Sequence, residues 1–175
     1  MTAQRNWQRT LTRLLRHRWL DEDDTRKAIP PDMVTRLMQR VAASEQRHSG
    51  EIRIYVEAGL PTSYLWRDAS PRERAVAIFG RLRVWDTEQN NGVLIYLLLA
   101  EHAIEIIADR GIDRHVSAED WQAIVARMGE AFRAKRFEDG LTQALGEVSA
   151  LLVAHFPLTD GQANPDELPN APSLG

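Results

Sequence analysis

The apolar stretch at residues 92–99 (GVLIYLLL) constrains the fold of this chain most strongly. It has no polar face, which is typical of a central strand in a sheet whose two faces are both covered by helices. The tight connection at residues 100–102 leads directly into a second apolar stretch, AIEIIA, at residues 103–108. Two strands joined by so short a turn form an antiparallel hairpin. The chain is therefore expected to build a sheet between layers of helices.

A third strand and the helix after it extend this sheet. Residues 51–58 (EIRIYVEA) alternate apolar and polar side chains, which predicts a strand with one apolar face. Ser70 and Glu73 form the pattern of a capping box, with Pro71 in the first turn, so a helix is expected over residues 70–83. A strand–helix–strand crossover of this kind is parallel and right-handed.

Three further helices complete the predicted architecture. Apolar residues recur at helical spacing over residues 30–48, 117–132 and 137–156. The predicted fold class is α/β: a three-layer α/β/α sandwich with a small mixed sheet, made of a parallel crossover and an antiparallel hairpin, and an extra N-terminal amphipathic helix. Three strands are clear, and a fourth is sought around residues 113–117 or in the loop at Tyr64.

The chain divides into a basic N-terminal segment, one α/β domain and a tail. Residues 1–28 are predicted to hold a basic amphipathic helix and an acidic linker, and residues 29–157 the α/β domain. Residues 158–175 are rich in proline and glycine and show no periodicity, which predicts a disordered tail. Residues 1–20 contain five arginines and no acidic residue, whereas the whole chain carries a net charge of −3.

The N-terminal helix is a candidate docking element. Its apolar residues recur at helical spacing, and arginines fill the other face. Such a helix binds an anionic membrane surface or an acidic groove on a protein partner. The alternative is that its apolar stripe packs on the α/β core or on a second copy of the chain. The candidate docking residues are Trp7, Arg9, Leu11, Arg13, Leu15, Arg16 and Trp19.

Composition argues against several classes of function. The 175 residues include no cysteine, which removes disulfides, thiolate zinc sites and thiol nucleophiles. The net charge of −3 argues against a dedicated nucleic-acid binder, which usually carries a strong basic excess. The sequence shows neither a secretory signal nor the run of ~20 apolar residues that a membrane helix needs. We therefore expect a cytoplasmic protein, peripheral at the inner membrane face if the N-terminal helix docks there.

One group of polar residues is expected at the carboxyl ends of the parallel strands, where ligands of α/β sheets collect. Carboxylates with a histidine bind a divalent metal or perform acid–base chemistry. The alternative is that these residues are solvated parts of loops. The group consists of Glu57, Asp68, Glu101 and His102.

A second, denser group is expected at the opposite end of the sheet. Oxygen ligands of this kind suit Ca²⁺ or Mg²⁺, and the candidate metal residues are Asp86, Asn91, Asp109 and Asp113. The alternative is turn chemistry, because Asn-Asn-Gly at residues 90–92 supplies backbone positions with positive φ.

One segment of the chain has a distinctive order of features: an Asn-Gly, an apolar strand, a short turn, a second strand and an Asp-Arg-Gly. This segment is residues 84–113, VWDTEQNNGVLIYLLLAEHAIEIIADRGID. This order, followed by FRAKRFEDGL at residues 132–141 and His-Phe-Pro at residues 155–157, resembles the TPM domain family. The resemblance covers residues 29–157 and implies an α/β/α sandwich. Some members of that family are described as acid phosphatases or calcium binders.

The chain departs from the family pattern at two points. It has Glu101 in the turn where the family commonly shows Asp-Arg, and Asp109-Arg110-Gly111 where Gly-Tyr/Arg-Gly is common. The resemblance therefore supports the fold more strongly than the reaction.

Two functions compete at this point. The first is a non-enzymatic binding module that docks a protein partner or a membrane surface, and the absence of a recognisable nucleophile motif favours it. The alternative is a metal-assisted phosphatase-like hydrolase with a divalent metal near Asp86, Asn91 and Asp109.

Overall fold

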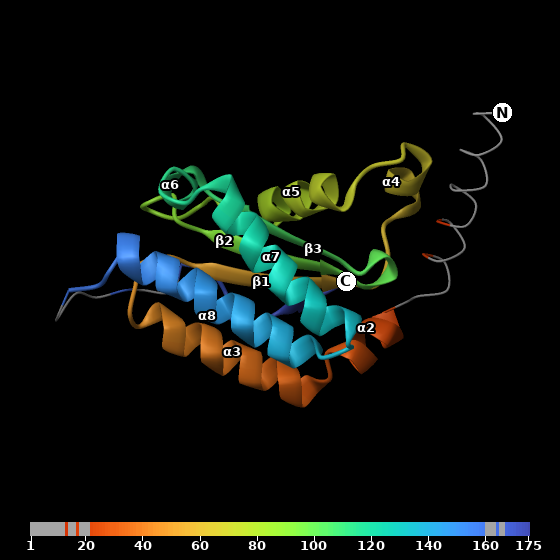
Figure 1. Ribbon diagram of the computed structural model, residues 1–175, viewed down its shortest axis with the longest axis horizontal. Coiled ribbons are helices and arrows are strands. Elements are labelled where there is room, and N and C mark those ends of the chain that lie inside the picture. Colours follow the sequence, from red (N-terminus) through yellow and green to blue (C-terminus); the bar gives the residue numbers. More distant parts are fainter. Residues whose placement is uncertain (1–12, 14–16, 18–21, 160–163, 165–166) are drawn as a thin grey trace.

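A mixed, four-stranded sheet lies at the centre of the molecule (Figure 1). The computed structural model describes residues 13, 17, 22–159, 164 and 167–175. The strand order is β3-β2-β1-β4. As predicted, β1 and β2 are parallel, and β2 and β3 form an antiparallel hairpin. The strands are β1 (Ile52–Glu57), β2 (Val93–Leu98), β3 (Ala103–Ala108) and β4 (Ser173–Leu174).

Helices cover both faces of this sheet and confirm the three-layer α/β/α sandwich. Helices α3, α7 and α8 lie on one face, and α5 lies on the other (Figure 1). Helix α5 is the predicted crossover between β1 and β2. The described helices are α2 (Glu22–Ala28), α3 (Pro31–Glu45), α4 (Thr62–Trp66), α5 (Pro71–Arg81), the 3-10 turn η1 (Leu99–Glu101), α6 (Arg110–Asp113), α7 (Ala118–Arg133) and α8 (Phe137–His155).

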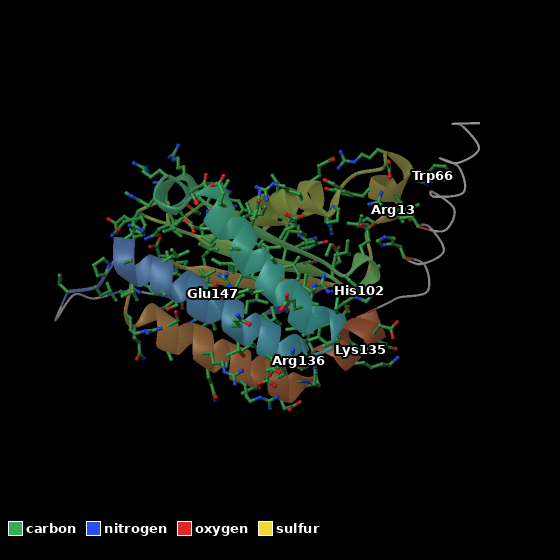
Figure 2. The ribbon with its side chains drawn as sticks, viewed as in Figure 1. Arg13, Trp66, His102, Lys135, Arg136 and Glu147 are labelled. Carbon is green, nitrogen blue, oxygen red and sulfur yellow. The ribbon has the colours of Figure 1, made fainter. Side chains whose placement is uncertain are left out.

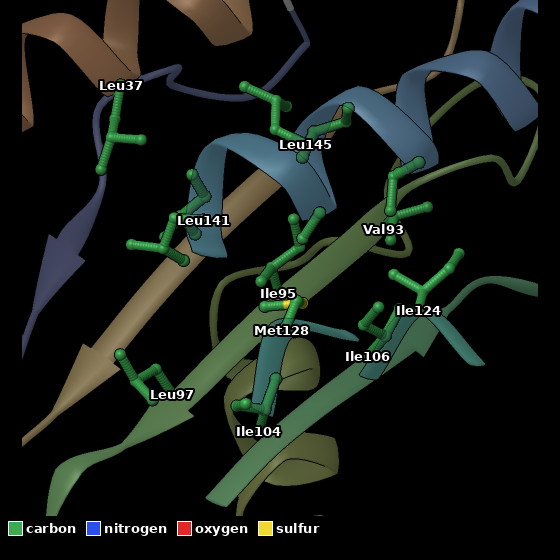
Figure 3. Packing of buried hydrophobic residues seen from close by; sticks show 14 of the residues in the cluster. Leu37, Val93, Ile95, Leu97, Ile104, Ile106, Ile124, Met128, Leu141 and Leu145 are labelled. Carbon is green, nitrogen blue, oxygen red and sulfur yellow. The ribbon is translucent and has the colours of Figure 1, made fainter. Parts of the chain in front are cut away.

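The alternation of side chains along the strands produces two hydrophobic cores. On β2, Val93, Ile95 and Leu97 point toward α7 and α8, where Figure 3 shows them among residues of those helices. The intervening residues Leu94 and Tyr96 pack on the α5 side. All six residues of β2 are buried, as expected of a central strand between two helical layers.

The predicted helix start at Ser70 is confirmed in detail. The Ser70 hydroxyl accepts a hydrogen bond from the Glu73 backbone N–H at 3.2 Å, and the Glu73 carboxylate accepts one from the Ser70 N–H at 3.3 Å. This capping box fixes the first turn of α5, and thereby the loop that enters it from β1.

Residues 51–58 were predicted as a strand with one apolar face, and the structure buries the polar face of β1 as well. All six residues of β1 are buried, including Arg53 and Glu57. Two contacts account for this burial: Arg74 of α5 and Tyr96 surround Glu57, and β4 pairs in parallel with the edge of β1. The Arg53 guanidinium donates to the Ser173 hydroxyl at 2.8 Å.

The prediction of a disordered tail is therefore wrong for its described part. Leu168 is 7% exposed in the core on the α5 side, and the Gly175 N–H donates to the Val56 carbonyl at 2.9 Å. The fourth strand lies at residues 173–174. The two places predicted for it differ: Tyr64 lies in the helix α4, and residues 113–117 contain the end of α6 and a loop.

The predicted acidic linker is also partly wrong, because residues 22–28 form the helix α2. Its cations lie in the last turn, at Arg26 and Lys27. In the described ranges, no helix is long and apolar enough to span a membrane.

Candidate functional site

A buried ion pair lies at the carboxyl ends of the parallel strands. Glu57, at the end of β1, is 5% exposed and pairs with Arg74 of α5, which is 9% exposed. The Arg74 Nε donates to the Glu57 carboxylate at 2.9 Å, and the Tyr96 hydroxyl donates to it at 2.8 Å. The Arg74 guanidinium also lies over the Tyr64 ring, 5.0 Å from its centroid.

Burial and charge act in opposite directions on these groups. Burial alone lowers the pKa of Arg74, but the hydrogen bonds and charge of Glu57 outweigh it, so the pKa of Arg74 lies above its usual value. Burial raises the pKa of Tyr96, and the neighbouring Glu57 carboxylate raises it further. The trio is thus a carboxylate held between a permanent cation and a neutral phenol.

The second carboxylate at this end, Glu101, is bound by the N-terminal segment. Arg13 donates to the Glu101 carboxylate at 2.6 Å and to Asp68 at 2.7 Å, and so joins two residues that the sequence placed at this end. Its remaining nitrogen donates to the Ala69 carbonyl at 2.6 Å. Figure 2 shows Arg13 beside the chain that carries α4.

His17 completes this contact, and its tautomer is fixed by its partners. The Leu60 backbone N–H donates to the His17 Nδ1 at 2.9 Å, so the proton of the neutral ring resides on Nε2. That Nε2 donates to Glu101 at 2.8 Å. Burial raises the pKa of Glu101, but hydrogen bonds from His17 and Arg13 outweigh burial and hold it below the usual range.

The strand-end cluster is defined as Arg13, His17, Glu57, Arg74, Tyr96 and Glu101, and its charged groups have partners within the chain. Each carboxylate is paired, and both nitrogens of His17 are used. The sequence analysis placed the two glutamates at this end and assigned Arg13 to the candidate docking helix, but it missed His17, Arg74 and Tyr96. His102 lies apart from the cluster: it is exposed and occupies a turn at φ 50°.

The candidate metal residues lie at the opposite end of the sheet, as predicted. Asp109 caps α6, where its Oδ1 accepts from the Arg110 N–H at 2.7 Å. The Gly111 N–H donates to the Asn90 carbonyl at 2.7 Å, which ties α6 to the loop before β2. A side chain at Gly111 would meet that carbonyl at 2.3 Å, so the glycine is required for this contact.

Two of these four residues carry buried oxygens that lack a hydrogen-bond partner among the described residues. They are the Asn91 Oδ1 and the Asp109 Oδ2. Asp86 and Asp113 are exposed. Within the described ranges, no group of three or more His, Asp or Glu side chains is arranged to hold a metal ion.

Of the candidate docking residues, Arg13 lies within the described part of the chain. It is held against the α/β domain, with 19% of its side chain exposed. Trp7, Arg9, Leu11, Leu15, Arg16 and Trp19 lie outside the described residues.

A groove of about 720 Å³ runs along the outer edge of β3, and sequence analysis did not identify it. Side chains from both faces of β3 line it, which places the strand edge at its floor. Trp121 and Val125 of α7 form one wall, and Arg72 of α5 lies at the other side. Arg72 pairs with Glu105 of β3 at 3.3 Å.

The comparisons with known proteins agree with this architecture. The TPM domain family matches the chain over residues 23–151. The chain belongs to the TPM domain family. The matched residues include β1, β2, β3 and α6, whereas β4 lies outside them. Among curated proteins, none shows significant similarity to this chain.

Two solved structures share the fold. The BA42 protein of the psychrophilic bacterium Bizionia argentinensis has 28% identity and a TM-score of 0.70, over 81% of this chain and 91% of its own. The N-terminal domain of a protein from P. gingivalis has 18% identity and a TM-score of 0.58, over 75% of this chain and 83% of its own. The second likeness concerns the fold alone.

Proposed function

We propose that this TPM domain is a non-enzymatic interaction module and that a protein partner binds in the groove along β3. The observation that carries the proposal is the contrast between this groove and the strand-end cluster. Each carboxylate of the cluster already has a cation or another hydrogen-bond donor within the chain, whereas the groove combines a strand edge with an apolar wall. Protein modules commonly bind partner segments at exposed sheet edges and in apolar grooves.

The proposal is tested with peptides selected against the full chain from a random-peptide phage library. Ala126 is exposed and lines the groove, so Ala126→Arg places a long charged side chain in it. The matched control is Ala154→Arg, at an exposed position of α8 outside the groove. We expect selected peptides to bind the wild type and the control but not Ala126→Arg. If selection enriches no peptide, or if both variants bind equally, the groove is not the binding surface.

A divalent-cation site at the α6 end is the second candidate, and the unpartnered oxygens of Asn91 and Asp109 favour it. Carboxylate and amide oxygens are the donors that Ca²⁺ and Mg²⁺ prefer. Asp86 and Asp113 lie in the segments beside them and are exposed. A cation held here would supply the Lewis acid of the phosphatase-like alternative.

Thermal denaturation with Ca²⁺, Mg²⁺ or Mn²⁺ tests this site. Ligands that bind the folded state raise the melting temperature. We expect Asp109→Asn to remove that rise and Asp32→Asn, at an exposed position of α3, to keep it. No rise at millimolar ion would exclude the site. If the wild type releases phosphate from an aryl phosphate and variants of Asp86 and Asp109 do not, this result would favour the enzyme over the interaction module.

A further inference from the structure

The hydrogen-bond pattern of the hairpin determines which backbone groups of β3 face outward. Asp109 and Gly92 lie opposite each other by the register of the hairpin, and the Asp109 N–H donates to the Gly92 carbonyl at 2.8 Å. In an antiparallel pair, residues alternate between those that bond to the partner strand and those that face away from it. The backbone N–H and C=O groups of Ile104, Ile106 and Ala108 therefore face the groove.

These outward groups are unpaired in the described part of the chain, in which no hydrogen bond reaches them outside the hairpin. The opposite edge of the sheet is treated differently, because β4 pairs with β1 there. Proteins usually protect a free edge with proline, lysine, a bulge or a covering segment. The sequence AIEIIA of β3 has a single charge, Glu105, and its register with β2 is continuous.

The two walls of the groove differ in chemistry. Side chains of a strand beside β3 would alternate between the same two faces as those of β3. On one face they would meet Trp121 and Val125, and on the other the Arg72–Glu105 pair. The Trp121 Nε1 is buried and has no acceptor among the described residues, which is uncommon for an indole N–H.

We infer that the partner bound in this groove is an extended peptide segment, which adds to the sheet as a fifth strand beside β3. This inference rests on the proposed function and specifies its partner. Backbone hydrogen bonds to Ile104, Ile106 and Ala108 supply affinity, and the walls select side chains. The segment carries apolar residues toward α7, alternating with polar or charged residues toward Arg72 and Glu105. A carbonyl or side-chain oxygen of the segment accepts from Trp121.

A second copy of the chain fits the groove less well. The edge of β3 lies between the wall formed by α7 and Arg72 of α5. A single extended peptide is narrow enough to lie between these walls. A second copy that paired its own β3 here would also have to place its α7 and Arg72 beside those of the first copy.

The test uses the full chain and synthetic versions of the peptides selected from the phage library. Ala108→Pro removes one outward N–H and places a ring at the edge, while the pairing with β2 does not use that N–H. We expect it to weaken binding about ten-fold or more, with an unchanged melting temperature.

The peptide is modified in a second experiment, by methylation of every second backbone nitrogen. Binding is expected to be abolished when the methylated nitrogens are those that face β3, and to stay intact when they face away from it. Trp121→Phe keeps the apolar wall and is expected to weaken binding about two- to ten-fold, the range for one hydrogen bond.

Amide hydrogen exchange supplies a readout that a different binding mode would not produce. Peptide addition should protect the amides of Ile104, Ile106 and Ala108, which face the groove. If Ala126→Arg abolishes binding while Ala108→Pro and peptide methylation do not, the groove is the site but its ligand is not a strand. If Ala126→Arg has no effect, the proposed function itself fails. A dimer of the chain that Ala108→Pro dissociates would replace the peptide by a second copy.

Discussion

His48 is fully buried, and both nitrogens of its ring are used within the chain. Its Nδ1 donates to the Gly50 carbonyl at 3.0 Å, so the Nε2 accepts from the Ser44 hydroxyl at 2.8 Å. Burial lowers the pKa of His48 from 6.5 to about 4. The histidine thus connects the end of α3 to the start of β1 as a neutral ring.

Because the folded state excludes a proton that the unfolded state binds, the free energy of unfolding depends on pH. This contribution is fully present above pH 6.5 and is lost as the pH falls toward 4. Its full size is at most about 3 kcal/mol. Urea unfolding across this range should show the decline. NMR titration should find the His48 ring still neutral below pH 6.5, and a His48 pKa near 6.5 would contradict the assignment.

The pair of Glu57 and Arg74 makes a prediction about unpaired buried charge. Arg74→Met leaves the Glu57 carboxylate without its cation and should lower the free energy of unfolding by about 3–5 kcal/mol. Tyr96→Phe removes one hydrogen bond to a charged group and should cost about 1.5–3 kcal/mol. The double variant Glu57→Gln, Arg74→Met should recover much of the loss. Urea unfolding at neutral pH measures the free energy of unfolding of each variant. If Arg74→Met loses no more of this free energy than Tyr96→Phe does, the prediction is contradicted.

At the scale of elements, the strands and long helices were predictable because their signals are local. Residues 103–108 were predicted as a strand and form β3 with the same bounds. Partners at long range were not predictable: His17 reaches Glu101 across 84 positions of sequence, and no local pattern marks the pair. The groove was missed for the same reason, since it needs α5, β3 and α7 to be placed together.

The contact between the N-terminal segment and the strand ends gives the third prediction. Glu101→Gln removes the charge that binds Arg13 and His17, and it should speed hydrogen exchange at the Leu60 amide, which donates to His17. The expected loss of stability is roughly 1–3 kcal/mol. Asp68→Asn is the matched control, because Asp68 is 83% exposed and its pair with Arg13 is worth about 0–1 kcal/mol. Equal exchange rates in both variants would contradict the role of Glu101.

The same variant addresses membrane docking by the N-terminal segment. Arg13 is held by Glu101 and Asp68, so its charge is partly neutralised within the chain. If the segment binds anionic membranes, Glu101→Gln should increase cosedimentation with phosphatidylserine vesicles, and added salt should reverse the gain. Vesicle binding that is absent in the wild type and in Glu101→Gln would exclude this docking mode.

At the scale of the whole molecule, the two edges of the sheet differ. Residues 173–174 pair with β1, whereas β3 has no second strand partner among the described residues and lines the groove. The sequence of the tail did not predict this, because two residues of strand, Ser173 and Leu174, are too short for a periodic signal. Residues 167–175 contact β1 and the core on the α5 side, and these contacts are properties of the assembled fold.

Two leucines of this tail provide the last prediction, because the same substitution should have different effects at each. Leu168 is 7% exposed within the core on the α5 side, whereas Leu174 is 38% exposed. Leu168→Ala should lower the free energy of unfolding by about 2–3 kcal/mol, since it removes buried apolar groups and leaves a cavity. Leu174→Ala should cost less than about 1 kcal/mol. Urea unfolding measures both, and two equally small losses would mean that the tail does not stabilise the sheet. Two equally large losses would mean that the exposed Leu174 side chain stabilises the fold as much as the buried Leu168 does, which would contradict the prediction.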